Sequence, residues 1–374
     1  MHLTTRDNAI DILKALGIVF MVYGHIDTPQ MHFIYLFHMA IFFIASGYLF
    51  KNSYSDNWSG VKCFIKRKIK TLYWPYVFWM CIFTLFHNLF IDINVYTNNE
   101  LFLEKVSGSY AKLTEYLSST EILKCMLKNF LMMGNEQMGN ALWFLNALLL
   151  LSVLYCFLDF LMKKMPVLEH IFYQGILSLL LLVAGYTCYL HGIYAGGVAR
   201  IFSFYCLFYL GGVIKRYVLM RYICKCPVLF AGLAFVGLLI IDPYCDIELA
   251  RNQYTNPVFL IIASIFGWIF VYGVSAEIEK RKILVKFLCV IGKNTMPIII
   301  LHFLAMKLIT GVGLLIFNEP AYCLASFTTY YQGYGWWIAY TIIGVAAPLW
   351  LNYGYEMTLA KCKQLKLVIA KGVR

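Results

Sequence analysis

The chain has 374 residues, of which 61% are hydrophobic and only 13% are charged, and its mean hydropathy is +0.71. Soluble globular proteins are about 45–50% apolar and about 25% charged, so this composition excludes a soluble enzyme, a nucleic-acid-binding protein and a disordered scaffold. The net charge of +12 must therefore be explained by where the basic residues lie along the chain.

Ten apolar stretches reach the length of about 20 residues that a helix needs to cross a bilayer. In chain order they cover residues 9–26, 32–50, 71–91, 141–162, 171–190, 198–214, 227–242, 256–276, 288–313 and 335–356. A shorter amphipathic segment near 121–133 is typical of a helix that lies in the membrane interface. The sequence thus predicts an all-α polytopic membrane protein with about ten transmembrane helices. Residues 1–374 form a single membrane-embedded domain, and an outer loop at about 92–140 could cover an outward-facing site.

The distribution of basic residues supports this topology. With the N-terminus in the cytoplasm, only six of the 31 lysines and arginines fall in outer segments, namely Lys105, Lys112, Lys124, Lys128, Arg200 and Arg251. Cytoplasmic loops carry an excess of lysine and arginine, so both termini are predicted to be cytoplasmic. The positive charge is then a topology signal and requires no nucleic-acid partner. No cleavage site follows the first apolar run, so this helix is expected to stay in the mature protein.

The first predicted helix carries ionisable side chains within its apolar run. Such groups cost roughly 2.5–3.5 kcal/mol each to insert, so they suggest a function. Asp11 and Lys14 can pair on one face. Lys14 and His25 are eleven residues apart, so they project within about 20° of each other and lie about 16 Å apart along the axis. With Asp27 at the water boundary, this face predicts a polar path. The alternative is an ion pair that fixes packing and an interfacial histidine.

Two further histidines fall in other predicted helices. A short turn precedes the second helix, so His38 is expected in its outer third, level with His25. Ser46 lies in the inner half of the same helix, where small residues favour close helix packing. His302 lies within the ninth predicted helix. Each histidine alone is explained by packing, but three in the outer halves of different helices favour a shared cavity in which one takes and returns a proton.

The basic run at residues 66–70 marks the inner end of the third predicted helix. It is at least an anchor of the kind expected on the cytoplasmic side. Arg67 and Lys70 could also hold phosphate groups, since arginine pairs well with phosphate oxygens. The pair Cys224 and Cys226 lacks a second pair of ligands at zinc spacing, so no metal site is expected.

Five segments in chain order carry a more specific pattern. They are Asp11-Ile12-Leu13-Lys14 with Tyr23-Gly24-His25, Phe37-His38-Met39 with Ser46-Gly47-Tyr48-Leu49, Arg67 to Pro75, Leu142-Trp143-Phe144-Leu145 with Leu148, and Gly292-Lys293-Asn294-Thr295 with Leu301-His302. Together they resemble the acyltransferase-3 family of integral-membrane O-acyltransferases, in particular its fucose 4-O-acetylase-like branch. The resemblance covers nearly the whole chain.

The resemblance implies a multi-pass enzyme of the bacterial inner (plasma) membrane. It would take an acyl group, usually acetyl, from cytoplasmic acyl-CoA as co-substrate, with no permanently bound cofactor. It would pass that group to a hydroxyl of a cell-surface glycan or a lipid-linked sugar at the outer side. The family's catalytic histidine maps onto His25. The family's usual arginine eleven residues earlier is Lys14 here, and its R-x-x-R pair becomes Arg67 and Lys70, so two bidentate forks are lost.

We expect the remaining polar residues to support one of the two substrates. The acceptor side would be served by His38, His302 and Asp27, and the acyl donor would be held by Asp11, Lys14, Arg67, Lys70 and Ser46. His25 could act as a general base on the acceptor hydroxyl or carry the acyl group as a nucleophile. The sequence leaves both mechanisms open.

Two other functions are compatible with part of the pattern. A proton-coupled transporter or flippase of a glycan or small molecule would also contain intramembrane charges, but such proteins show repeated halves with interrupted helices, which this sequence lacks. A structural subunit would tolerate alanine at both Lys14 and His25. The acceptor, the acyl chain and the oligomeric state are not predicted.

Overall fold

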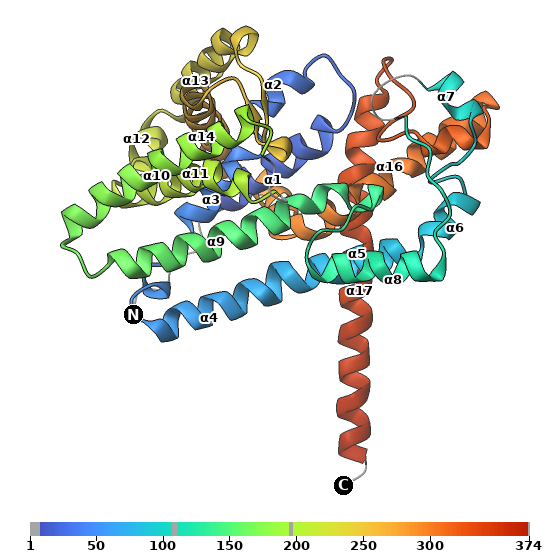
Figure 1. Cartoon of the computed structure of the whole chain (residues 1–374), viewed down its shortest axis with the longest axis horizontal. Coiled ribbons are helices and arrows are strands. Elements are labelled where there is room, and N and C mark those ends of the chain that lie inside the picture. The colour runs from blue at the N-terminus through green and yellow to red at the C-terminus, as the bar shows by residue number, and fades with distance from the viewer. Residues whose placement is uncertain (1–7, 107–110, 194–196, 373–374) are drawn as a thin grey trace.

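The computed structural model describes residues 8–106, 111–193 and 197–372. Arg6 and the two chain ends, which the sequence places in the cytoplasm, lie outside these ranges, as does a short part of the outer loop. The described residues are mostly helical (Figure 1). One antiparallel ribbon pairs β1 (Ile247–Glu248) with β2 (Gln253–Tyr254). The chain is therefore an all-α protein with a minor β element between two helices.

The helices follow one another with short connections. The first half contains α1 (Asn8–Gly24), α2 (Met31–Tyr35), α3 (Ala40–Tyr48), α4 (Trp58–Lys68), α5 (Trp74–Leu85), α6 (His87–Asp92), α7 (Leu101–Lys105), α8 (Ser119–Phe130), α9 (Trp143–Met162) and α10 (Val167–Leu190). The second half contains α11 (Ala199–Arg216), α12 (Met220–Lys225), α13 (Pro227–Ile241), α14 (Pro257–Glu279), α15 (Lys282–Lys293), α16 (Thr295–Phe317) and α17 (Trp336–Gly372). Short 3-10 turns lie at Asn52–Tyr54, Gln137–Leu142, Asp242–Tyr244, Leu249–Arg251 and Ala321–Ala325.

Six segments of the described residues are long and apolar enough to cross a membrane. They are Met31–Tyr48, Gln137–Met162, Glu169–Leu190, Pro227–Tyr244, Pro257–Glu279 and Thr295–Phe317. The other predicted stretches, at 9–26, 71–91, 198–214 and 335–356, coincide with α1, with α5 and α6, with α11 and with the first part of α17. The multi-pass class is confirmed, whereas the total of ten spans stays a prediction.

Two of the predicted stretches are built differently from a single straight helix. The third is part of a long rod in which α4 and α5 are joined by a π turn at Ile69–Tyr73 (Figure 1). Pro75 lies in the first turn of α5, and its missing N–H interrupts the regular hydrogen-bond ladder there. The ninth stretch is divided between two helices, because the helix is interrupted at Asn294. Residues 288–293 belong to α15, and α16 begins at Thr295.

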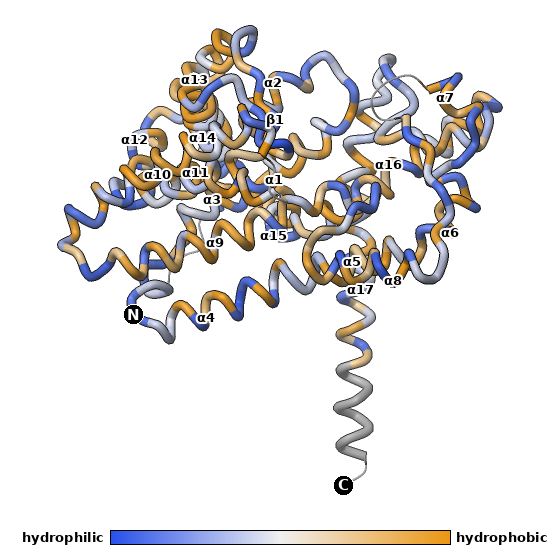
Figure 2. The backbone as a smooth tube through the Cα atoms, viewed as in Figure 1, coloured by the Kyte–Doolittle hydropathy of each residue, from blue (hydrophilic) through white to orange (hydrophobic). Residues whose placement is uncertain are grey.

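Burial divides the helices into central and peripheral ones. In the most apolar windows of α9 and α16, 67% of the residues are buried, but only 22% are buried in α10 and α13. Figure 2 shows that α13 is nevertheless hydrophobic along its length. An exposed apolar helix is stable where lipid replaces water, so α10 and α13 form the lipid-facing edge and α1, α3, α9 and α16 form the core.

Glycines allow the central helices to approach one another closely. A methyl group at Gly47 of α3 would overlap the carbonyl of Phe208 on α11, and one at Gly211 of α11 would overlap the carbonyl of Ile44. Gly292 of α15 lies in the same way against the carbonyl of Asp11. Small residues are enriched where membrane helices pack backbone to backbone. These contacts fix α1 and α3; His25 directly follows α1, and His38 lies just before α3.

The predicted interfacial segment is α8, which begins and ends close to the expected bounds. Ser118 and Glu121 form a capping box at its N-terminus, which satisfies two otherwise unpaired backbone N–H groups. The helix packs against α5, and Leu123 and Leu127 are 59% and 60% exposed. Its amphipathic character is thus present in the structure, and its position in the interface stays a prediction.

Candidate functional site

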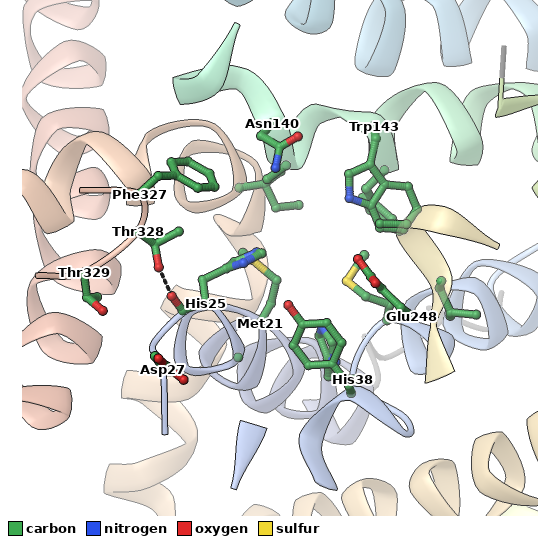
Figure 3. A pocket seen from close by; sticks show the side chains of 18 of the residues that line it. Met21, His25, Asp27, His38, Asn140, Trp143, Glu248, Phe327, Thr328 and Thr329 are labelled. Carbon is green, nitrogen blue, oxygen red and sulfur yellow. Dashed lines mark hydrogen bonds between the residues drawn. The ribbon is translucent and has the colours of Figure 1, made fainter. Parts of the chain in front are cut away.

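A cavity with a volume of about 640 Å³ lies at the end of α1. Ile18, Met21 and His25 line it from one stripe of α1, because residues spaced by three and four share a helix face. The turn between α2 and α3 contributes His38, and the start of α9 contributes Trp143. Figure 3 shows the side chains of Met21, His25, His38 and Trp143 around a common space.

The histidines predicted on separate helices are brought together here. The ring of His302 on α16 stacks against that of His25, with ring centroids 5.3 Å apart and an angle of 26° between the planes. His302 is fully buried behind the cavity wall, and the Nδ1 atom lies 2.9 Å from the carbonyl oxygen of Ile298. A carbonyl can only accept a hydrogen bond, so Nδ1 carries the proton and the other ring nitrogen of neutral His302 keeps its lone pair.

His38 has the same tautomer for the same reason. Its Nδ1 atom lies 2.9 Å from the carbonyl oxygen of Ile34 in the preceding turn. The proton on Nδ1 leaves the Nε2 lone pair of the neutral ring available to accept a proton from a bound group. The cavity therefore offers His25 and His38 as two imidazoles that can exchange protons with a substrate.

A loop that follows α16 closes the other side of the cavity. Ser326, Phe327 and Thr328 line it, and Thr328 donates a hydrogen bond to the backbone carbonyl of His25 (Figure 3). Asp27, at the exposed rim, accepts a hydrogen bond of 2.7 Å from Gln332. The loop thus holds the chain at His25 and at Asp27, just after the end of α1.

This loop is itself held by a buried cation. Lys307 of α16 is 5% exposed, and its ammonium group donates hydrogen bonds of 2.9 Å to the Leu324 carbonyl and 2.8 Å to the Ser326 carbonyl. Sequence reasoning placed Lys307 inside a span and gave it no role. The two bonds show that it organises the cavity wall.

We predict that Lys307→Met releases this wall. Methionine has a similar length but leaves two carbonyls without their donor, which costs about 1–3 kcal/mol each when they stay buried. Hydrogen exchange of residues 320–332 should become faster, while that of α10 should not change. Lys361→Met, at an exposed position of α17, is the matched control. Unchanged exchange in the loop of Lys307→Met would contradict this role.

The residues predicted to hold the acyl donor lie outside this cavity. Lys14 pairs with buried Asp11 at 2.8 Å, on the same stripe of α1 and one turn before Ile18. Arg67 is exposed and donates a hydrogen bond of 2.6 Å to the Tyr54 hydroxyl, and Lys70 is exposed on the π turn. The hydroxyl of Ser46 donates to the Phe42 carbonyl one turn earlier on α3. Residues 11, 14, 46, 67 and 70 line neither this cavity nor the two smaller ones.

A second cavity, of about 430 Å³, lies at the ends of α3 and α11 that are distant from His25. Its lining includes Lys51, Lys215 and Arg216, which belong to the predicted cytoplasmic segments, and buried Asp159 of α9. Sequence reasoning used these cations only to assign topology. The structure shows that they share a concave surface.

Charged residues at the His25 cavity were also missed as site residues. Arg200, Arg251, Lys105 and Glu248 all line it. Burial raises the pKa of Glu248, and the nearby Arg251 guanidinium acts in the opposite direction. The hydrogen bond from exposed Lys105 to Glu319 raises the pKa of Lys105. The available signal was that Lys105, Arg200 and Arg251 are exceptions to the positive-inside rule.

The His, Cys, Asp and Glu side chains give no indication of a metal centre. Within the described ranges, no group of three His, Cys, Asp or Glu side chains is arranged to hold a metal ion. The chemistry of the cavity rests on imidazoles, hydroxyls and a few charged groups.

These observations define a multi-pass membrane protein with an internal cavity lined by imidazoles. A family model described as an acyltransferase domain matches residues 7–353. The chain therefore belongs to the acyltransferase-3 family and is a membrane acyltransferase. No match was found among curated proteins or among solved structures.

Proposed function

We propose that the protein transfers an acyl group, most simply acetyl, from cytoplasmic acyl-CoA to a hydroxyl of a surface glycan or glycan precursor. The observation that carries this proposal is the position of His25, on the wall of a cavity of about 640 Å³ that also contains His38. A cavity of this size accommodates a sugar unit and the end of a thioester arm. The proposed setting is a bacterial inner membrane, with the cavity at the outer side.

His25 would manage the proton of the acceptor hydroxyl. In a general-base mechanism it takes that proton while the hydroxyl oxygen attacks the thioester carbonyl. The ester C–O bond forms, the C–S bond breaks, and the leaving thiolate recovers the proton from the imidazolium as CoA thiol. In a nucleophilic mechanism His25 first forms an acyl-imidazole with release of CoA thiol, and the hydroxyl then attacks it. The stack with His302 would hold the ring in place for either route.

On the donor side, the phosphates of CoA would lie against the exposed cations of α4 and the π turn, Arg67 and Lys70. The thioester arm would then follow the stripe of α1 that runs from Lys14 past Ile18 to His25. Charged and polar groups on one stripe of a membrane helix favour a path away from lipid. The inner cavity with Lys215 and Arg216 is the competing site for the same phosphates.

Kinetics separate the two donor sites. Arg67→Gln removes a charged hydrogen-bond donor, so KM for acetyl-CoA should rise about 10- to 100-fold, with a smaller change in kcat. Arg216→Gln removes the equivalent group from the inner cavity and should leave KM within about twofold. The reverse result would show that the CoA phosphates bind in the cavity lined by Lys215 and Arg216.

The acyl transfer itself is tested with purified protein in sealed vesicles. Acetyl-CoA with a labelled acetyl group is enclosed on the side of Arg67, and fucose, glucose or glucuronate is supplied on the side of His25. We expect the label to appear as a sugar ester on the second side and CoA thiol on the first. A transporter would instead move a sugar without releasing thiol. Absence of both label transfer and thiol release would overturn the proposal.

The transporter alternative has less support in the structure. His25 and His38 line one cavity that also includes Asp27, and His302 stacks against His25 from behind its wall. Membership of the acyltransferase-3 family also favours group transfer. The fucose 4-O-acetylase-like branch remains part of the proposal.

A further inference from the structure

Arg200 occupies the wall between two outer cavities. It lies in the first turn of α11 and lines both the 640 Å³ cavity and a neighbouring cavity of about 460 Å³. Asn140, Trp143, Ala250 and Arg251 are also shared by the two. A group bound at Arg200 could therefore extend from the His25 cavity into the second one.

The guanidinium of Arg200 is fixed by contacts that leave its charge uncompensated. One nitrogen donates a hydrogen bond of 2.9 Å to the Ala250 carbonyl, and the plane lies over the Trp143 ring at 5.1 Å. Its Nε atom is buried and has no hydrogen-bond partner in the described part of the chain. No carboxylate of the described ranges forms an ion pair with Arg200. A half-buried cation without a counter-charge is costly unless a ligand supplies one.

The other charged groups around the cavity are already paired. Arg251 contacts Glu248 at 3.2 Å, and Lys105 contacts Glu319 at 2.5 Å. Asp27 accepts a hydrogen bond from Gln332. The carboxylates near the cavity thus have partners of their own, and the remaining demand for negative charge is at Arg200.

We propose that Arg200 binds a carboxylate or phosphate substituent of the acceptor, so that the enzyme acts on an anionic glycan or glycan precursor. Arginine suits such groups, because its planar fork donates two parallel hydrogen bonds to their oxygens. Trp143 and Asn140 beside it supply an aromatic face and an amide, which suit a sugar ring with its hydroxyls. That the bound anion is the acceptor rests on the proposed acyl transfer, whereas anion binding by Arg200 does not.

Binding is measured first, because it needs no activity. The unfolding midpoint of the purified protein is followed with glucuronate, glucose 1-phosphate, glucose or CoA. The two anionic sugars should raise the unfolding midpoint as their concentration increases, and glucose should not. The rise should disappear in Arg200→Gln, persist in His25→Ala, and persist in Arg221→Gln, which alters an exposed arginine of α12. An equal rise with glucose, or a rise that survives Arg200→Gln, would overturn the inference.

CoA distinguishes the two sources of phosphate. If CoA alone produces a rise that depends on Arg200, the site serves the donor and the inference is wrong. Arg200→Lys provides a second variant should Arg200→Gln fold poorly. It keeps the charge but loses the fork, so the anion-induced rise should be smaller than in the unaltered protein but present.

Acyl transfer then connects this site to the reaction. With glucuronate as acceptor, Arg200→Gln should raise KM about 10- to 100-fold, as expected for a lost hydrogen bond to a charged group, while KM for acetyl-CoA stays unchanged. Arg200-dependent anion binding without any acyl transfer would refute the proposed function alone. If Arg200→Gln has the same KM for glucuronate as the unaltered protein, and both also use a neutral sugar with that KM, the inference alone is refuted.

Discussion

Replacing His25 by alanine is expected to abolish acyl transfer while the protein keeps its fold. A positioned general base contributes about 10²- to 10⁴-fold to a rate, and loss of a nucleophile would cost at least as much. The imidazole lies at the end of α1, and the hydrogen bond from Thr328 goes to the backbone carbonyl of His25. Alanine therefore removes the reacting group and keeps this contact. The initial rate of CoA thiol release with acceptor present is the measurement.

Two further variants make this result specific. His191→Ala removes an exposed histidine that follows α10 and should have no effect on the rate. His302→Ala removes the ring that stacks against His25 but leaves His25 in place, so it should lower kcat less than His25→Ala does. Unchanged activity of His25→Ala would show that His25 takes no part in the reaction. Equal losses in His302→Ala and His25→Ala would make His302 the alternative reacting group.

The second large effect is expected on stability, at the crossing of α3 and α11. Alanine in place of glycine inside a helix normally stabilises it by about 1 kcal/mol. At Gly47 the added methyl group would overlap the Phe208 carbonyl, and a backbone atom cannot move aside as a side chain does. We expect Gly47→Ala to cost about 1–3 kcal/mol, as overpacking does, and to lower the unfolding midpoint by about 1–4 °C, because the entropy of unfolding of a chain of this length is large.

Gly232→Ala is the matched control for this substitution. Gly232 also lies within a helix, α13, but no atom lies within 4 Å of the position that its methyl group would take. This variant should be as stable as the unaltered protein or slightly more so. A midpoint in Gly47→Ala that equals that of Gly232→Ala would show that the two helices can separate without cost.

The sequence predicted the fold class and the apolar stretches because hydropathy over about 20 residues depends only on composition. Finer features required tertiary information. The π turn before α5 packs against α9, and the break at Asn294 lies between α15 and α16, which both pack against α1. The close approach at Gly47 is suggested by a small residue, but its partner Gly211 lies 164 positions away in the sequence.

The site could be predicted in part for a similar reason. His25 and His38 fall near helix ends, so their depth in the membrane follows from the sequence, and both line the cavity. Arg200 lies at the start of its helix and reads as a topology signal only. Its significance depends on Trp143 and Ala250, which come from other elements, and on the lack of an ion pair with any carboxylate of the described residues.

The length of α17 has a mechanical consequence. A helix of 37 residues is about 55 Å long, whereas the hydrocarbon layer is about 30 Å thick. If its first part crosses the bilayer, as the sequence predicts, roughly half of the helix extends past the lipid as a stiff arm, which Figure 1 shows pointing away from the other helices. A fluorescent protein fused at the tip of this arm would be kept clear of the bilayer surface, and distance-dependent energy transfer between two such fusions would report self-association without disturbing catalysis.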